Sequence, residues 1–115
     1  RHVMIHCCGK VGELFPELID MGLNVFNPFQ PECMDLVNVK RQFHGRLAFY
    51  GGMSVQQVLP HGTPEEVRRE TRRLLRLLGK GGGYIAGPSH AVPKDVPPEN
   101  VGAMLEVLQN QNREL

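Results

Sequence analysis

A histidine and a cysteine stand two residues apart near the start of the chain, in the sequence Ile5-His6-Cys7-Cys8-Gly9. The short apolar segment over residues 3–7 predicts a buried strand. Because side chains alternate along a strand, His6 and Cys8 share one side and Cys7 faces the other. Imidazole nitrogen and thiolate sulfur are donors that zinc prefers. The pair therefore predicts half of a zinc site; the alternative is a packed histidine beside two buried cysteines.

A further histidine, His90, follows the last predicted strand in the sequence Gly87-Pro88-Ser89-His90. Strand ends of a barrel converge on one mouth, so we expect His90 to approach His6 and Cys8. Three protein ligands and one open position are typical of a catalytic zinc, which would deprotonate a thiol substrate by stabilising the thiolate. Cys33, in a predicted loop, is a competing third ligand.

Substrate binding is expected of a second group of residues, which comprises Asn27, Gln30, Tyr50 and His61. His61 lies in a predicted loop, where it can reach a ligand. His2 and His44 are interpreted as surface or packing residues. His44 ends a predicted helix, where a cation complements the helix dipole.

Strand and helix patterns alternate four times along the chain. Strands are predicted over residues 3–7, 24–26, 47–50 and 84–86, and helices over residues 11–21, 34–43, 63–78 and from about residue 98 onward. The Asn27-Pro28 turn is expected to end the second strand, and Gly51-Gly52 the third. Such alternation predicts an α/β fold with parallel strands and helical crossovers, as in half of an eight-stranded barrel or a small open sheet.

The third helix carries the clearest signals. Thr63 is a good N-cap, Pro64 suits the first position, and Glu66 completes a capping box. The apolar stripe predicted for its buried side comprises Val67, Thr71, Leu74, Leu75 and Leu78. Its five arginines are interpreted as a solvated outer face, with a partner-binding strip as the alternative. The glycines at 81–83 precede a strand, so they are interpreted as a connector rather than a phosphate-binding loop.

Composition narrows the class of protein. The 115 residues suit one domain, residues 1–115, and 41% hydrophobic and 22% charged residues indicate a globular chain. A net charge of +1 and the lack of a long apolar run predict neither a nucleic-acid nor a membrane partner. Three cysteines, two of them adjacent, form no disulfide framework, so a reducing cytoplasm is expected. Because the chain starts without Met in a predicted buried strand, we expect a fragment.

Several segments together resemble the uroporphyrinogen decarboxylase (URO-D) and cobalamin-linked methyltransferase superfamily, over nearly the whole chain and in the family order. The His-x-Cys-Gly segment at residues 6–9 is similar to the family's. The stretches that carry the rest of the resemblance are Gly51-Gly52-Met53-Ser54, Leu59-Pro60-His61-Gly62-Thr63-Pro64-Glu65-Glu66, Gly82-Gly83-Tyr84-Ile85, Pro88-Ser89-His90 and Asp95-Val96-Pro97-Pro98-Glu99-Asn100.

The resemblance implies the C-terminal half of a (β/α)8 TIM barrel. The family's methyltransferases move a methyl group between a corrinoid and a thiol, using zinc held by a His-x-Cys pair and a later cysteine. Here His90 stands in place of that cysteine. The family's decarboxylases remove carboxylates from a tetrapyrrole without a cofactor and use a histidine near the position of His90. The His-x-Cys pair favours zinc-assisted methyl transfer, with a small-molecule or tetrapyrrole substrate and a corrinoid protein as candidate partners.

A half-barrel taken alone leaves two sheet edges unpaired and one sheet face uncovered. Such edges pair readily with other chains, so we expect a homo-oligomer or pairing with the missing barrel half. Two alternatives for the function remain, namely cofactor-free decarboxylation of a tetrapyrrole by a uroporphyrinogen decarboxylase, and an inactive half-barrel fragment or interaction module.

Overall fold

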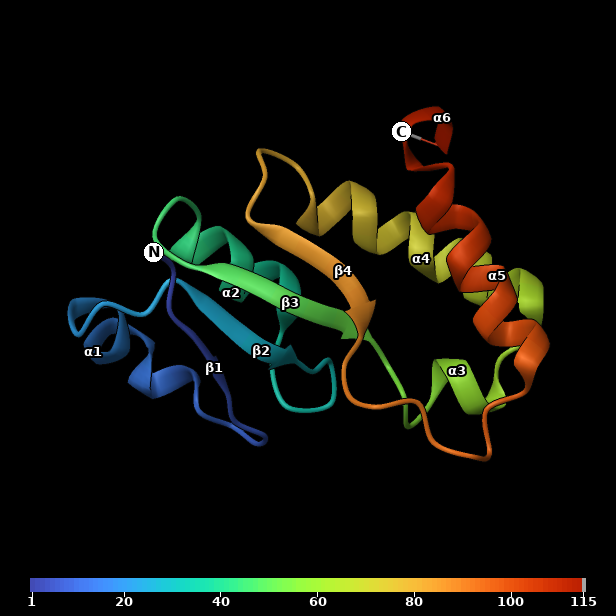
Figure 1. The fold of residues 1–115 in the computed structure, drawn as a ribbon, viewed down its shortest axis with the longest axis horizontal. Coiled ribbons are helices and arrows are strands. Elements are labelled where there is room, and N and C mark those ends of the chain that lie inside the picture. The colour runs from blue at the N-terminus through green and yellow to red at the C-terminus, as the bar shows by residue number, and fades with distance from the viewer. Residues whose placement is uncertain (115) are drawn as a thin grey trace.

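Four strands form one parallel sheet in the order β1-β2-β3-β4 in the computed structural model of the chain, which describes residues 1–114 (Figure 1). The strands are β1 (Met4–His6), β2 (Val25–Phe29), β3 (Ala48–Met53) and β4 (Tyr84–Pro88). Each strand pairs with the next one along the chain, and a helical segment crosses over between them. The α/β fold with parallel strands is therefore confirmed.

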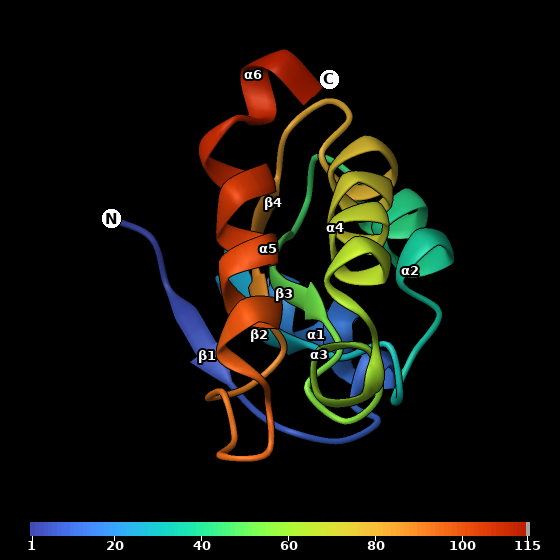
Figure 2. The same ribbon diagram turned by 90° about the vertical axis from the view of Figure 1, so that its right-hand side faces the viewer.

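The helices lie mainly on one face of this sheet. They are the 3-10 helix η1 (Gly12–Leu14), α1 (Phe15–Asp20), α2 (Leu36–Phe43), α3 (Val58–His61), α4 (Pro64–Leu78), α5 (Pro98–Gln109) and α6 (Gln111–Glu114). Figure 1 shows α2 and α4 behind the sheet, and Figure 2 shows them to one side of it, on the right of the view, with α5 near β4. No helix within residues 1–114 is long and apolar enough to cross a membrane.

Phenylalanine rings form the core between the sheet and these helices. Phe15 of α1 meets Phe26 of β2 edge to face at 4.7 Å between ring centroids, and Phe29 stacks on Phe49 at 4.4 Å. All four rings are fully buried. On the opposite, concave face of the sheet, Met4 and Ile85 remain 57% and 47% exposed. One face of the sheet is therefore well packed, and the other carries exposed apolar side chains.

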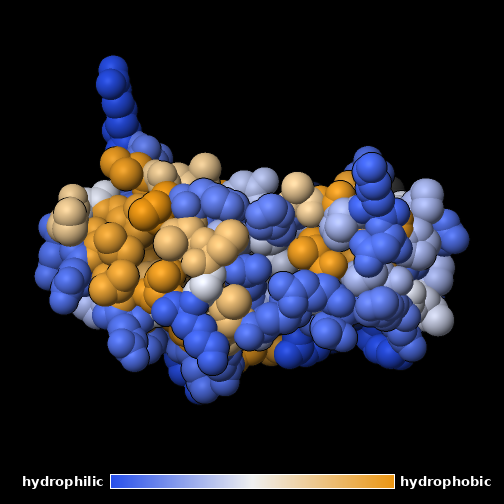
Figure 3. All heavy atoms as spheres, turned by 90° about the horizontal axis from the view of Figure 1, so that it is seen from below, coloured by the Kyte–Doolittle hydropathy of each residue, from blue (hydrophilic) through white to orange (hydrophobic). Residues whose placement is uncertain are grey.

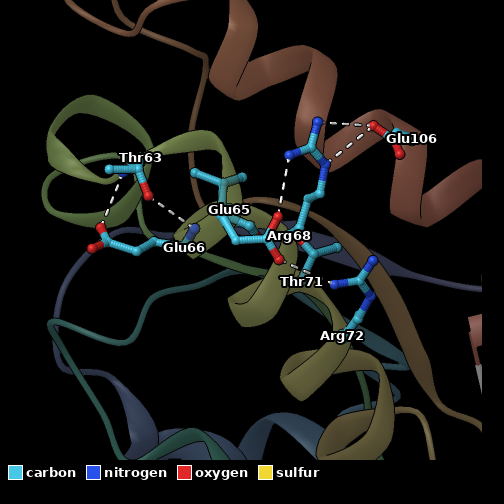
Figure 4. A network of polar contacts seen from close by, with 8 residues as sticks. Thr63, Glu65, Glu66, Arg68, Thr71, Arg72 and Glu106 are labelled. Carbon is cyan, nitrogen blue, oxygen red and sulfur yellow. Dashed lines mark hydrogen bonds and ion pairs between the residues drawn. The ribbon is translucent and has the colours of Figure 1, made fainter.

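Helix α4 begins as predicted. The Thr63 hydroxyl accepts a hydrogen bond from the Glu66 amide at 3.1 Å, and the Glu66 carboxylate accepts one from the Thr63 amide at 3.0 Å (Figure 4). The predicted apolar stripe is buried throughout. On the outer side, Arg68 forms ion pairs with Glu65 and with Glu106 of α5, which helps to fix the two helices side by side.

Strands β2 and β3 run past the points where the sequence predicted their ends. β2 continues through Asn27 and Pro28 to Phe29, and the Asn27-Pro28 peptide is cis. The register with β3 shifts between Phe26 and Phe29, and such an irregularity lets a strand accommodate a proline. β3 likewise continues through Gly51 and Gly52 instead of ending there.

Two helices differ from the prediction in their bounds, and one differs in the residues that it buries. The helix predicted over residues 11–21 is divided into η1 and α1, which places Pro16 in the first turn of α1. A short helix, α3, interrupts the loop predicted after β3. On α5 the apolar side chain of Leu105 is 46% exposed, whereas Asn100 is buried and donates to the carbonyls of Leu59 and Gly62. A buried polar side chain that hydrogen-bonds to backbone carbonyls cannot be predicted from the spacing of apolar residues along a helix.

Candidate metal centre

The side chains of His6, Cys8 and His90 converge at the carboxyl end of the sheet. One ligand atom from each lies within 4.8 Å of the other two, and all three residues are exposed. His6 Nε2 is 3.8 Å from Cys8 Sγ, and the imidazole rings of His6 and His90 meet edge to face at 5.7 Å. The three side chains singled out in the sequence are brought together; metal binding by them stays a prediction.

Curvature of the sheet makes this meeting possible. β1 and β4 are the two edge strands, and His90 lies just after β4. In a flat sheet, three strand spacings of about 4.8 Å would hold the edges about 14 Å apart. The approach of His90 to His6 across this width fits a sheet that bends toward closure, which is the geometry of a barrel wall.

Asn27 orients the His6 ring from the neighbouring strand. His6 and Asn27 are register partners, and His6 Nδ1 lies 2.5 Å from Asn27 Oδ1. The Asn27 amide nitrogen donates to the Tyr50 carbonyl at 3.1 Å, which fixes Oδ1 as the atom facing the imidazole. His6 Nδ1 must then carry the proton, because an amide oxygen only accepts. The Nε2 lone pair then faces Cys8 Sγ, which lies 3.8 Å away.

The other predicted site residues occupy separate places. Gln30 is buried, and its side-chain oxygen accepts from the Gly9 amide and the Cys33 thiol at 3.4 and 3.5 Å. Cys33 therefore lies with Gln30, outside the cluster of His6, Cys8 and His90. Tyr50 is half-buried and lies on the concave side of β3, as the partner of Ile85.

His61 is also outside the cluster. It ends α3 and borders a separate surface hollow together with Glu66 and Arg69. Substrate binding by Asn27, Gln30, Tyr50 and His61 remains a prediction, and in Asn27 the side chain already has a structural partner on each side.

A polar pair near the same end of the sheet was not singled out in the sequence. The buried Ser54 hydroxyl, just after β3, donates to the Glu32 carboxylate at 2.5 Å and accepts from the Gln57 amide at 2.9 Å. The signal that could have found it is position, because both residues follow the carboxyl end of a strand.

The donor set of the cluster fits a zinc ion. One thiol sulfur and two imidazole nitrogens are a common set for zinc, and tetrahedral bonds of about 2.0–2.3 Å place ligand atoms about 3.5 Å apart. The 3.8 Å between His6 Nε2 and Cys8 Sγ is close to that value. Small rotations of exposed side chains would bring His90 to the same point, leaving a fourth position open to solvent.

Comparisons with known proteins bear on the family and the fold of the chain. The sequence matches the family described as uroporphyrinogen decarboxylase (URO-D) over residues 1–111. A uroporphyrinogen decarboxylase from Pseudoalteromonas translucida is 31% identical over 75 residues, which cover 65% of this chain and 21% of the relative. One from Legionella pneumophila is 34% identical over 74 residues, which cover 64% of this chain and 20% of the relative. The chain thus spans about a fifth of the length of these curated relatives.

A solved structure shares the fold. The methyltransferase from Methanosarcina mazei matches 96% of this chain and 32% of its own, with a TM-score of 0.76 and 20% sequence identity. The likeness shows that the four β/α units are part of an α/β barrel.

Proposed function

This chain belongs to the uroporphyrinogen decarboxylase (URO-D) family, and we propose that it forms part of an enzyme that transfers a methyl group between a corrinoid and a thiol. We propose further that His6, Cys8 and His90 hold one zinc ion. The observation that carries the proposal is the convergence of one thiol and two imidazoles from opposite edges of the sheet.

Each residue of the cluster has a defined part. Cys8 supplies the sulfur donor. His6 presents Nε2 because Asn27 holds the proton of the ring on Nδ1. His90 completes the set from the far edge of the sheet, and the exposed side of the cluster admits a substrate thiol. A bound zinc ion would lower the pKa of that thiol, so that the thiolate is available at neutral pH.

The reaction balances without a further reactant. In the proposed reaction the thiol sulfur would bond to the methyl carbon of the corrinoid substrate as the cobalt–carbon bond breaks, the electron pair of that bond would stay on the corrinoid, and the thiol proton would pass to solvent. The chain's residues contribute by holding the sulfur in line with the methyl group, and positioning of this kind can supply a large part of a rate enhancement. We propose that Tyr50 contacts the substrate from the concave side of the sheet, and that the corrinoid arrives on a separate protein.

A methyl-transfer assay tests this function. Zinc-loaded protein is mixed with methylcobalamin and 2-mercaptoethanol, and the loss of methylcobalamin absorbance is followed. We expect demethylation well above that of the Cys8→Ser variant, and loss of the activity when a chelator removes zinc. Equal rates for the protein and Cys8→Ser would contradict the proposal.

Cofactor-free decarboxylation of a tetrapyrrole is the second candidate. It is favoured by the relatives of 31% and 34% identity, which are named uroporphyrinogen decarboxylase. In that case His90 would contact the tetrapyrrole instead of a metal. Release of carbon dioxide from uroporphyrinogen, unaffected by chelators and lost in His90→Ala, would support this function over methyl transfer.

A further inference from the structure

A basic groove lies at the opposite end of the strands from the metal centre. It has a volume of about 510 Å³ and is bordered by the last turns of α2 and α4. These helices lead into the amino ends of β3 and β4, whereas His6, Cys8 and His90 lie at the carboxyl ends. The basic side chains that line the groove are Lys40, Arg41, His44, Arg76 and Lys80. None of its lining residues is acidic.

The cations of this groove lack the carboxylate partners found elsewhere on α4. Arg68, Arg72 and Arg73 all form ion pairs with glutamates of α4 or α5. Within the described part of the chain, Arg41, Arg76 and Lys80 have no such ion pair. The helix dipole favours a cation in the last turn of each helix. It does not explain why the cations of α2 and α4 line the same groove.

Lys40 and His44 form an ordered base for the groove. Lys40 is only 4% exposed, and its Nζ donates to the Gly82 carbonyl at 2.8 Å and to His44 Nδ1 at 3.1 Å. Burial lowers the pKa of this amine. Because His44 accepts at Nδ1, its Nε2 carries the proton and can donate to a ligand.

Gly81 makes room for the His44 ring. A side chain at position 81 would lie 2.8 Å from the imidazole Cε1. The ring also borders a second hollow of about 430 Å³, in which the basic groups are His2, His44 and Arg46. The basic surface therefore extends over two adjoining hollows and is larger than the binding site of a single ion.

We propose that this groove binds a phosphorylated small molecule of the nucleoside diphosphate class. Its volume falls in the range of small-molecule sites, and arginine and lysine are the side chains that recognise phosphate most often. Val37 and Leu77 add apolar surface, which suits a nucleobase. Leu77 is 46% exposed, so this surface is open to a ligand. The site is independent of the metal centre and of the function proposed for it.

Isothermal titration of the chain with ADP, pyrophosphate and adenosine tests the site. The variant is Arg76→Ala combined with Lys80→Ala, both of which replace exposed side chains. The matched control, Lys10→Ala with Lys94→Ala, removes the same charge from exposed positions that do not line the groove. Circular dichroism checks that every variant folds.

The proposal predicts that ADP binds more tightly than pyrophosphate, and that adenosine alone binds far more weakly. It also predicts that the groove variant loses about tenfold or more in affinity for ADP, because two charged contacts are removed, while the control keeps it. Absence of ADP binding at low salt would overturn the site. Equal losses in the groove variant and the control, or a preference for pyrophosphate over ADP, would overturn it as well.

Discussion

At the scale of single residues, Asn27 fixes the chemistry that His6 can offer. The Asn27 amide nitrogen donates to the Tyr50 carbonyl, and the Asn27 side-chain oxygen accepts from His6 Nδ1. Asn27 therefore selects the His6 tautomer that carries its proton on Nδ1. Histidines that bind metals commonly donate their other ring N–H to such an oxygen, which sets their orientation. The proposed zinc site therefore extends beyond its three ligands to a fourth residue on β2.

Replacement of Asn27 by leucine is expected to weaken zinc binding by about 10- to 100-fold, because the ring loses its acceptor and can rotate or change tautomer. Competition with a fluorescent zinc chelator measures the affinity. Asn27→Asp serves as the control, because a carboxylate oxygen also accepts from Nδ1. An unchanged zinc affinity in Asn27→Leu would show that the hydrogen bond between His6 and Asn27 has no part in metal binding.

The sequence predicted the shared side of His6 and Cys8 but not the contact to Asn27. Alternation of side chains is a local rule, and it needs only the presence of a strand. The His6–Asn27 hydrogen bond depends on the register between β1 and β2, which are joined through η1 and α1. Register is a tertiary property, so the sequence alone indicated a substrate role for Asn27 and missed its partner.

At the scale of elements, α4 is the best-specified part of the chain. Its first turn is closed by the reciprocal hydrogen bonds of Thr63 and Glu66, and it packs against α5 through Arg68 and Glu106. A capping box depends only on residues a few positions apart in the chain, and for this reason the sequence predicted the start of this helix correctly.

Thr63→Ala should lower the free energy of unfolding by about 1 kcal/mol, because the Glu66 amide loses its acceptor at the helix start. Urea denaturation followed by circular dichroism measures the change. Thr63→Ser keeps a hydroxyl and should retain most of the stability. A Thr63→Ala variant as stable as the parent chain would mean that the capping box contributes nothing.

Strand β3 shows the opposite case, in which a local signal was misleading. Gly51 and Gly52 predicted a strand end, yet the strand passes through both. Gly51 has φ of +134°, and a side chain there would lie 2.9 Å from the Phe29 backbone nitrogen. The glycine is needed because β2 approaches closely, and this approach cannot be seen in the sequence of β3 alone.

Gly51→Ala is expected to destabilise the chain by about 2 kcal/mol more than Gly22→Ala, because the added methyl group meets rigid backbone. Gly22 also has a positive φ, of +106°, but a side chain there has nothing within 4 Å. The pair separates conformational strain from steric contact. Equal losses in urea denaturation would show that the approach of β2 is not the reason for the glycine.

At the scale of the whole molecule, apolar surface gathers around the β1 edge. Val3, Met4, Leu14 and Met21 are 56%, 57%, 48% and 83% exposed. Figure 3 shows apolar surface concentrated at the end of the molecule where β1 and α1 lie. An unpaired strand beside exposed apolar side chains is a surface that favours association.

We therefore expect the chain to self-associate as its concentration rises, and Met4→Lys to reduce this association by placing a charge beside the β1 edge. Light scattering coupled to gel filtration gives the mass at each concentration. Leu105→Lys places the same charge at an exposed position of α5 and should leave association unchanged. A folded chain that stays monomeric at all concentrations would contradict this account of the edge.

The proposed metal centre requires His6, Cys8 and His90 to hold one zinc ion together. X-ray absorption at the zinc edge of the loaded protein tests it most directly. We predict one sulfur at about 2.3 Å and two imidazole nitrogens at about 2.0–2.1 Å, with the sulfur lost in Cys8→Ser and kept in Cys33→Ser. A spectrum without sulfur, or one whose sulfur survives Cys8→Ser, would contradict the proposed centre.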